Sequence, residues 1–196
     1  MDNLHLCFER ALEELGLAGS LPCDLPGAVS GCLRFRISTG SPYLADHRRP
    51  SGDYIDHAIG QALALYRCLP VGPALLRIDR EEEDDQVLTL GRLRRMGLPE
   101  PDFQQVQQGI THIYWQFFRE PDFLIPLFRE IVRGELDPAG LDGLCRHVYF
   151  LNRRHRILFH VPDDREVQIC APESPSLESL CARFAELRIL SPEQGR

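Results

Sequence analysis

Five acidic residues follow one another near the middle of the chain, from Glu81 through Glu82, Glu83 and Asp84 to Asp85. Adjacent like charges repel each other, so such a run costs stability unless solvent or a basic partner screens it. A run of this kind can serve as a docking surface for a basic protein, because its field raises the rate of association. Calcium binding is a weaker interpretation, since the run lacks the spaced ligands and central glycine of an EF-hand loop. The alternative is a solvated loop.

A thiol and an imidazole stand two positions apart at Cys145 and His147. On a strand this spacing puts both side chains on one face, where histidine can activate a cysteine nucleophile. No third residue that would orient the histidine is visible, and free cysteine is commonly a small buried hydrophobe. We therefore assign no catalytic residue, and keep a small enzyme or ligand-binding domain of unknown substrate as the alternative function.

Histidines 147, 155 and 160, together with Asp163 and Asp164, supply the residue types of a metal site. The spacing argues against one, because His155 and His160 differ by an odd number and face opposite sides of a regular strand. No cysteine ligands stand at finger-like spacing either. We interpret these residues as part of an aspartate-rich turn, and expect no metal and no cofactor.

Several enzyme classes are excluded by missing residues. All 22 basic residues are arginine, so there is no lysine for a phosphate-binding loop, a kinase strand or a Schiff base. The glycine-rich dinucleotide motif, the serine elbow and the H-E-x-x-H zinc motif are also absent. The net charge of -7 has the wrong sign for attraction to phosphate backbones. We expect no nucleic-acid partner.

The aromatic cluster Tyr114, Trp115, Phe117 and Phe118 could stack on bases or sugars. Such platforms are usually surrounded by basic side chains, and this one is not. Each ring buries a large area when it packs inside a protein. The sequence therefore favours core packing for these four residues.

The compartment is suggested by the N-terminus and the cysteines. The chain starts Met1, Asp2, Asn3 with no apolar leader, and no segment reaches the ~20 consecutive apolar residues of a membrane span. The seven cysteines are odd in number and form no regular framework. We expect a cytoplasmic protein with no membrane partner, whose cysteines stay reduced as small buried hydrophobes.

In the first half of the chain, apolar spacing predicts two helices and three strands. The helices cover residues 4–15 and, capped by Asp53, the segment up to Pro70. Strands are expected at 33–37, 74–78 and 87–90, with the acidic run as a hairpin tip or a loop between the last two. Residues 91–109 are interpreted as a connector because prolines and glutamines obscure any pattern.

The second half shows clearer patterns. A strand is expected at 110–118 and a helix from Pro121 to Gly134. Three short antiparallel strands follow at 148–151, 156–161 and 166–170, and a helix starting at Ser174 should cover one side of this meander. The sum is an α+β fold, one domain over residues 1–196, with helices packed on a mostly antiparallel sheet.

The segment Y-F-L-N-R-R-H-R-I-L-F-H-V-P-D-D-R-E-V-Q-I, residues 149–169, resembles the end of a bacterial family known as domain of unknown function 3885. The strand at 33–37, the helix around 58–66 and the strand at 75–78 fit the same plan more loosely. The resemblance implies a strand ending near an asparagine, a strand with a Phe-His pair, an Asp-Asp-Arg turn and a third strand. It implies no reaction and no catalytic residue. The corresponding positions are Asn152, Phe159, His160, Asp163, Asp164 and Arg165.

Small acidic bacterial proteins of this general kind often look like cytoplasmic immunity partners of antibacterial toxins. Three features fit that class: the chain is compact, it lacks a recognisable catalytic motif, and it carries one concentrated acidic run. The hypothesis is that Glu81–Asp85 meets the basic cleft of a toxin domain and occludes its active site. A structural or regulatory subunit with no toxin partner is a third possibility.

Overall fold

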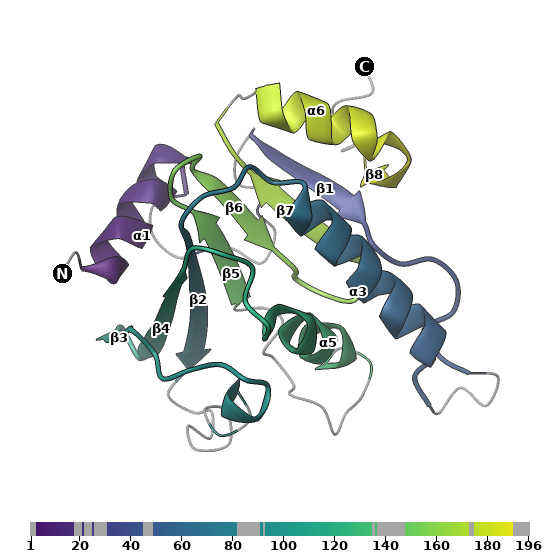
Figure 1. The fold of residues 1–196 in the computed structure, drawn as a ribbon, viewed down its shortest axis with the longest axis horizontal. Coiled ribbons are helices and arrows are strands. Elements are labelled where there is room, and N and C mark those ends of the chain that lie inside the picture. The colour runs from purple at the N-terminus through teal and green to yellow at the C-terminus, as the bar shows by residue number, and fades with distance from the viewer. Residues whose placement is uncertain are drawn as a thin grey trace.

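The computed structural model describes residues 3–17, 21, 25, 31–44, 49–81, 91, 93–134, 136, 148–172 and 175–189. Within these residues, eight strands join in one sheet in the order β3-β4-β2-β5-β6-β7-β1-β8. Every strand pairing is antiparallel, so the expected α+β fold is confirmed (Figure 1). The strands are β1 (Cys32–Arg36), β2 (Ala74–Glu81), β3 (Phe103–Gln107), β4 (Ile110–Phe117), β5 (Val148–Asn152), β6 (Ile157–His160), β7 (Glu166–Cys170) and β8 (Arg188–Ile189).

The helices lie on both faces of the sheet. On one face α3 and α5 pack against each other, and α6 lies over the β1 end. The helix α1 packs on the opposite face of the sheet, against the alternate side chains of the same strands. None of the helices in the described residues is both long and apolar enough to cross a membrane. The helices are α1 (Leu4–Glu14), α3 (Gly52–Arg67), α5 (Leu124–Gly134), α6 (Pro175–Arg183) and the 3-10 helix η2 (Ala185–Leu187).

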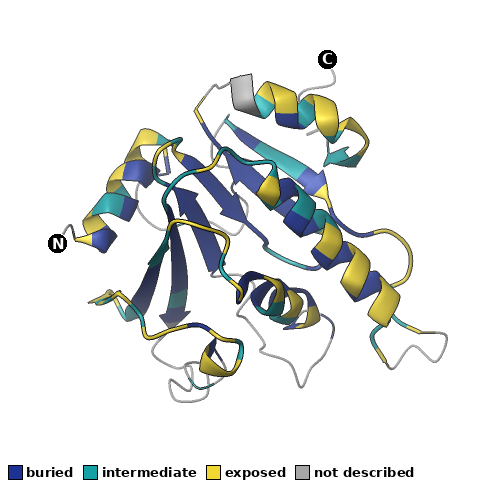
Figure 2. Cartoon of the chain, viewed as in Figure 1, coloured by how far each residue is buried: buried dark blue, intermediate teal, exposed yellow. Residues whose placement is uncertain are grey.

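Alternation along the strands builds two cores. In β2, Leu76 and Ile78 face α3 and α5, whereas Leu75 faces α1, as the period-2 geometry of a strand requires. The inner surfaces of both layers are almost entirely buried, while the outer helix faces are exposed (Figure 2). The four helices predicted from apolar spacing, α1, α3, α5 and α6, are all present, and each places its apolar side chains on the sheet.

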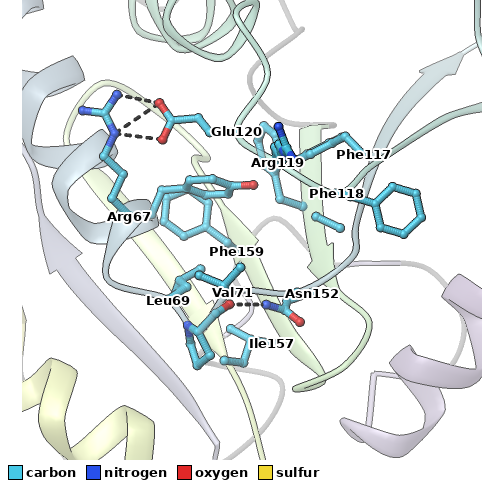
Figure 3. Close-up of a pocket in the computed structure, with 15 residues that line it drawn as sticks. Arg67, Leu69, Val71, Phe117, Phe118, Arg119, Glu120, Asn152, Ile157 and Phe159 are labelled. Atoms are coloured by element: carbon cyan, nitrogen blue, oxygen red, sulfur yellow. Dashed lines mark hydrogen bonds and ion pairs between the residues drawn. The ribbon is translucent and has the colours of Figure 1, made fainter.

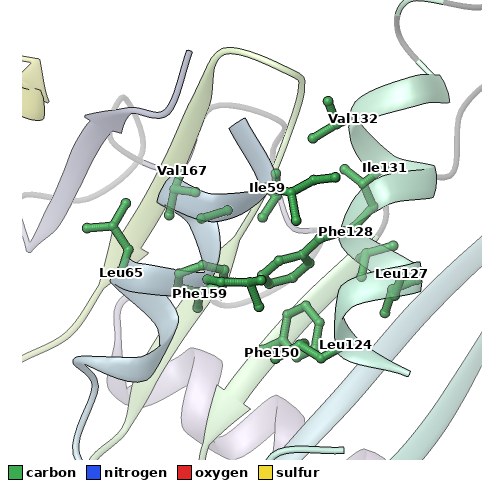
Figure 4. Close-up of a cluster of buried hydrophobic side chains, with 14 of the residues drawn as sticks. Ile59, Leu65, Leu124, Leu127, Phe128, Ile131, Val132, Phe150, Phe159 and Val167 are labelled. Carbon is green, nitrogen blue, oxygen red and sulfur yellow. The ribbon is translucent and has the colours of Figure 1, made fainter. Parts of the chain in front are cut away.

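The larger core centres on stacked aromatic rings (Figure 4). Phe128 of α5 stacks on Phe159 of β6 with 5.9 Å between ring centroids and 16° between the ring planes. Tyr66 of α3 meets Phe159 edge-on at 5.3 Å, and Phe150 closes the cluster. Each fully buried ring of this kind contributes about 2–3 kcal/mol by area, so the cluster is a main attachment of the helix layer to the sheet.

Helix boundaries follow local capping. The N-cap of α3 is Ser51, whose hydroxyl accepts from the Tyr54 amide at 3.4 Å. The expectation that Asp53 caps this helix is wrong by two residues, because Asp53 lies inside the first turn, where its charge favours the positive end of the helix dipole. Asn3 caps α1 in the same way, accepting from the Leu6 amide.

The connector expected at 91–109 is wrong in its second half, which forms β3. This strand pairs with β4 through a two-residue turn at Gln108 and Gly109, whose φ angles are 53° and 81°. Two consecutive positive φ angles are typical of the type I′ hairpin turn. The strand lies at the edge of the sheet and is largely exposed, so its apolar alternation is too weak to see in sequence.

The hairpin expected around the acidic run falls partly on residues 82–90, which lie outside the described residues. Over Ala74–Ile78, β2 is paired on one edge with β4 and on the other with β5. These partners come from far along the chain, which local patterns do not encode.

Candidate functional site

The acidic run begins at the end of β2, an interior strand of the sheet. Glu81 is the last residue of β2 and pairs with Ile110, next to the Gln108–Gly109 turn. Glu82, Glu83, Asp84 and Asp85 lie outside the described residues. The chain is described again at Gly91 and then at Leu93, which is 1% exposed in the larger core. The run is thus bounded by a sheet strand on one side and a buried anchor on the other.

Among the other sequence candidates, those that the structure describes do not assemble into one site. Cys145 and His147 lie outside the described residues. His155 sits in the β5–β6 turn, while His160 is fully buried in β6 with its Nδ1 2.9 Å from the Val148 carbonyl oxygen. No group of three or more histidine, cysteine, aspartate or glutamate side chains in the described ranges is arranged to hold a metal ion.

A buried charged cluster under α1 escaped the sequence analysis. Arg77 of β2 makes a two-pronged contact with Asp79, from Nε to Oδ1 at 2.6 Å and from Nη2 to Oδ2 at 2.9 Å. Its Nη1 donates to Glu9 Oε1 of α1 at 2.7 Å. His112 of β4 donates from Nδ1 to Asp79 Oδ1 at 2.6 Å. We name Arg77, Asp79, His112, Glu9 and His5 the α1 polar cluster.

The α1 polar cluster is satisfied within the chain. Burial by itself would raise the pKa of Asp79, but the hydrogen bonds from His112 and Arg77 outweigh burial and lower it. His5 stacks on His112 with ring centroids 5.5 Å apart, and its Nδ1 is 2.8 Å from the Tyr114 hydroxyl. Both Asp79 oxygens and all three guanidinium nitrogens are engaged, so this cluster holds α1 on the sheet.

The residues that carry the family resemblance are structural as well. Asn152 joins two segments, since its Nδ2 donates to the Pro70 carbonyl oxygen at 2.6 Å and its Oδ1 accepts from the His155 amide at 3.1 Å. Phe159 lies in the aromatic core and His160 stacks on Tyr149. These roles explain the spacing of the motif without any chemistry.

The two carboxylates of the Asp-Asp-Arg turn have different structural roles. Asp163 Oδ1 accepts from the amides of Arg165 and Glu166, which shapes the turn before β7. Asp164 points the other way and accepts from the Tyr54 hydroxyl at 2.6 Å, which ties α3 to the turn. Burial raises the pKa of Asp164, and burial together with Asp164 raises the pKa of Tyr54 to about 12.

The cysteine expectation is corrected at one pair. Cys32 of β1 and Cys170 of β7 are direct partners across the ladder and form a disulfide. Cys7, Cys68 and Cys181 are free, but they are half-buried and not fully buried as expected. The pair is 138 residues apart in sequence, so only the β1–β7 pairing reveals it.

An open pocket lies at the end of β2 that is far from Glu81. It has a volume of about 160 Å³ (Figure 3). Its lining comes from the end of α3, the 69–72 connection, the start of β2, the end of β4 with residues 118–120, and strands β5 and β6.

The aromatic cluster predicted to be core is only partly so. Tyr114 and Trp115 are core residues as predicted, at 0% and 2% exposed. Phe118 is 66% exposed and lines this pocket, so the core prediction is wrong there.

The protein is an antiparallel sheet covered by helices, in which the motif residues Asn152 and Asp163 stabilise turns. The family model described as "Domain of unknown function (DUF3885)" matches residues 31–190, and the chain belongs to that family. The expected resemblance is thereby confirmed over most of the chain. No curated protein and no solved structure matches it. Helix α1, which carries His5 and Glu9 of the α1 polar cluster, lies before the matched residues.

Proposed function

We propose that this protein is a cytoplasmic immunity protein, which binds a basic antibacterial toxin domain and occludes its active site. The acidic run Glu81–Asp85 forms part of the interface. The observation that carries the proposal is the place where the run starts, at the end of β2, an interior strand of the sheet. The backbone of Glu81 is paired with Ile110 of β4, so this end of the run needs no further ordering when a partner binds.

Charge supports the same proposal. The chain has a formal net charge of -7, and five of its negative charges are consecutive. Such a field steers a cationic partner and raises its association rate by roughly ten to a thousandfold at low salt. Inhibition by occlusion needs no catalytic group on the inhibitor, because the bound surface alone blocks the cleft.

The first experiment identifies the partner and its effect. The tagged full-length chain is purified from its native cell and the bound proteins are identified by mass spectrometry. We expect a basic protein that stops growth when expressed alone, and normal growth when both are expressed. A bound protein that is harmless alone, or a toxin whose activity is unchanged by saturating amounts of this chain, contradicts the proposal.

The second experiment tests the acidic run with that partner. The variant carries Glu81→Gln, Glu82→Gln, Glu83→Gln, Asp84→Asn and Asp85→Asn, which brings the net charge from -7 to -2. Its association should be roughly tenfold or more slower at low salt, with a flatter dependence on salt concentration.

A matched control separates local from overall charge. It neutralises five carboxylates that are exposed on other elements, and so has the same net charge as the first variant. We expect its association rate to stay close to that of the unmodified chain. Equal rates for both variants would remove the run from the interface. The control positions are Glu13, Asp53, Asp122, Glu178 and Glu186.

The compartment is tested by the Cys32–Cys170 pair. Disulfides are rare in the reducing cytoplasm, so a cytoplasmic immunity protein should carry this pair as thiols in the cell and as a disulfide after oxidation in air. Alkylation of intact cells before lysis, followed by mass spectrometry of both peptides, distinguishes the two states. An alkylation-resistant pair in the cell argues for an oxidising compartment instead.

A further inference from the structure

The pocket at the start of β2 is built as a preformed site. Arg67 and Glu120 close its rim with a two-pronged ion pair, in which Nε lies 2.9 Å from Oε2 and Nη2 lies 2.5 Å from Oε1. Asn152 holds the 69–72 connection through the Pro70 carbonyl. Both the helix end and the connection are therefore fixed to the sheet, and a ligand need not order them.

The size of the pocket limits what it can hold. Its volume of about 160 Å³ is close to the roughly 150 Å³ cavity that takes up one benzene molecule, and smaller than the 300–1,000 Å³ of pockets for larger ligands. Its accessible apolar walls include the side chains of Leu69, Val71 and Phe117. An apolar group no larger than one aromatic ring is the occupant that fits.

Two polar groups in this pocket have no partner among the described residues. The Tyr66 hydroxyl makes no hydrogen bond there, and the Arg119 guanidinium makes no ion pair, whereas Arg67 is neutralised by Glu120. Burial raises the pKa of Tyr66, with the Glu120 charge acting in the same direction, so its phenol keeps its proton and can donate. A hydroxyl donor and an unpaired cation together match a carboxylate.

We propose that this pocket binds a compact aromatic carboxylate: the ring lies against Leu69, Val71 and Phe117, and the carboxylate is held by Arg119 and Tyr66. This chemistry has two sources, a free aromatic acid or the C-terminal residue of a polypeptide. The site is separate from the acidic run, because the two are at opposite ends of β2. The proposal for this pocket and the proposal for the acidic run can therefore be tested independently.

The binding test uses phenylacetate and the dipeptide Gly-Phe as probes of the full-length protein. Titration is followed by amide chemical shifts, and saturable binding is expected at about millimolar concentration, as for a ligand of about ten non-hydrogen atoms. The shifts should concentrate on residues 66–74 and 117–120. Absence of saturable binding by both probes overturns the proposal.

Substitutions test the assigned contacts. Arg119→Gln and Tyr66→Phe should each weaken binding by about tenfold, the usual effect of losing a charge-assisted hydrogen bond. Arg10→Gln is the matched control, because it removes the charge of an exposed arginine on α1, on the other face of the sheet. Equal affinities for Arg119→Gln and Arg10→Gln would overturn the carboxylate assignment.

Two analogues with a neutral amide in place of the carboxylate complete the design. Phenylacetamide and the amide of Gly-Phe keep the rest of each probe, so each should bind at least about tenfold more weakly than its acid. Tighter binding of phenylacetate identifies a free acid as the source, and tighter binding of Gly-Phe identifies a chain terminus. Neutral analogues that bind as well as the acids would overturn the proposal and leave only an apolar pocket.

Discussion

Removal of Arg77 should be among the most destabilising single changes in the chain. Arg77→Met deletes the three hydrogen bonds to Asp79 and Glu9 and leaves the Asp79 carboxylate, whose side chain is 9% exposed, with His112 as its remaining partner. Breaking a buried pair on one side costs about 3–5 kcal/mol, because the other charge stays buried. Glu9 is 28% exposed and can turn to solvent, so it adds little.

The measurement is urea unfolding followed by the fluorescence of Trp115. It is the sole tryptophan of the chain and is 2% exposed, so its emission reports loss of the core. The matched control is Arg129→Met, because Arg129 pairs with Asp56 at 3.0 Å on the surface. An exposed pair is worth under about 1 kcal/mol, so the free energies of unfolding of the two variants should differ clearly.

A double variant tests the reason for the cost. Adding Asp79→Leu to Arg77→Met removes the stranded carboxylate and leaves the His112 Nδ1 without its acceptor, which costs about 1–3 kcal/mol. The double variant should therefore be more stable than Arg77→Met alone. A double variant that loses the sum of both single losses would refute the reasoning, as would an Arg77→Met variant no less stable than the surface control.

Three further predictions concern stability. Reduction of the Cys32–Cys170 disulfide should lower the free energy of unfolding by up to about 5 kcal/mol, because the two cysteines are 138 residues apart and the reduced chain gains conformational entropy when it unfolds. Equal urea midpoints with and without reductant would contradict this prediction. Burial lowers the pKa of His5, so on acidification the imidazole is protonated at a higher pH in the unfolded chain than in the folded one. The free energy of unfolding should therefore fall as the pH drops below 6.5. In His5→Asn, the urea midpoint should depend less on pH in this range. The pKa of Asp164 is instead raised by burial, so its contribution is present below 3.8 and is lost as pH rises through the higher folded value. Asp164→Asn should remove that loss in the same titration, provided that Tyr54 keeps its partner.

Local patterns carry part of the site and leave another part out. The signal for β3 was present in the Gln108–Gly109 pair between Val106 and Ile110, but an exposed edge strand has little apolar alternation to support it. The corresponding signal for the α1 polar cluster was Arg77, a charged residue on the strand predicted at 74–78, with Asp79 directly after that strand. Their partners on α1 and β4 could not be named from spacing alone.

The sequence by itself determined α1, α3, the β5–β7 meander, the α+β class and the family, because each depends on apolar periodicity or on a contiguous motif such as residues 149–169. Tertiary structure alone decided the place of β2 between β4 and β5, the Cys32–Cys170 disulfide and the pocket. The physical reason is the distance along the chain. These features form where residues many positions apart meet across the sheet, and no local pattern records which strands become neighbours.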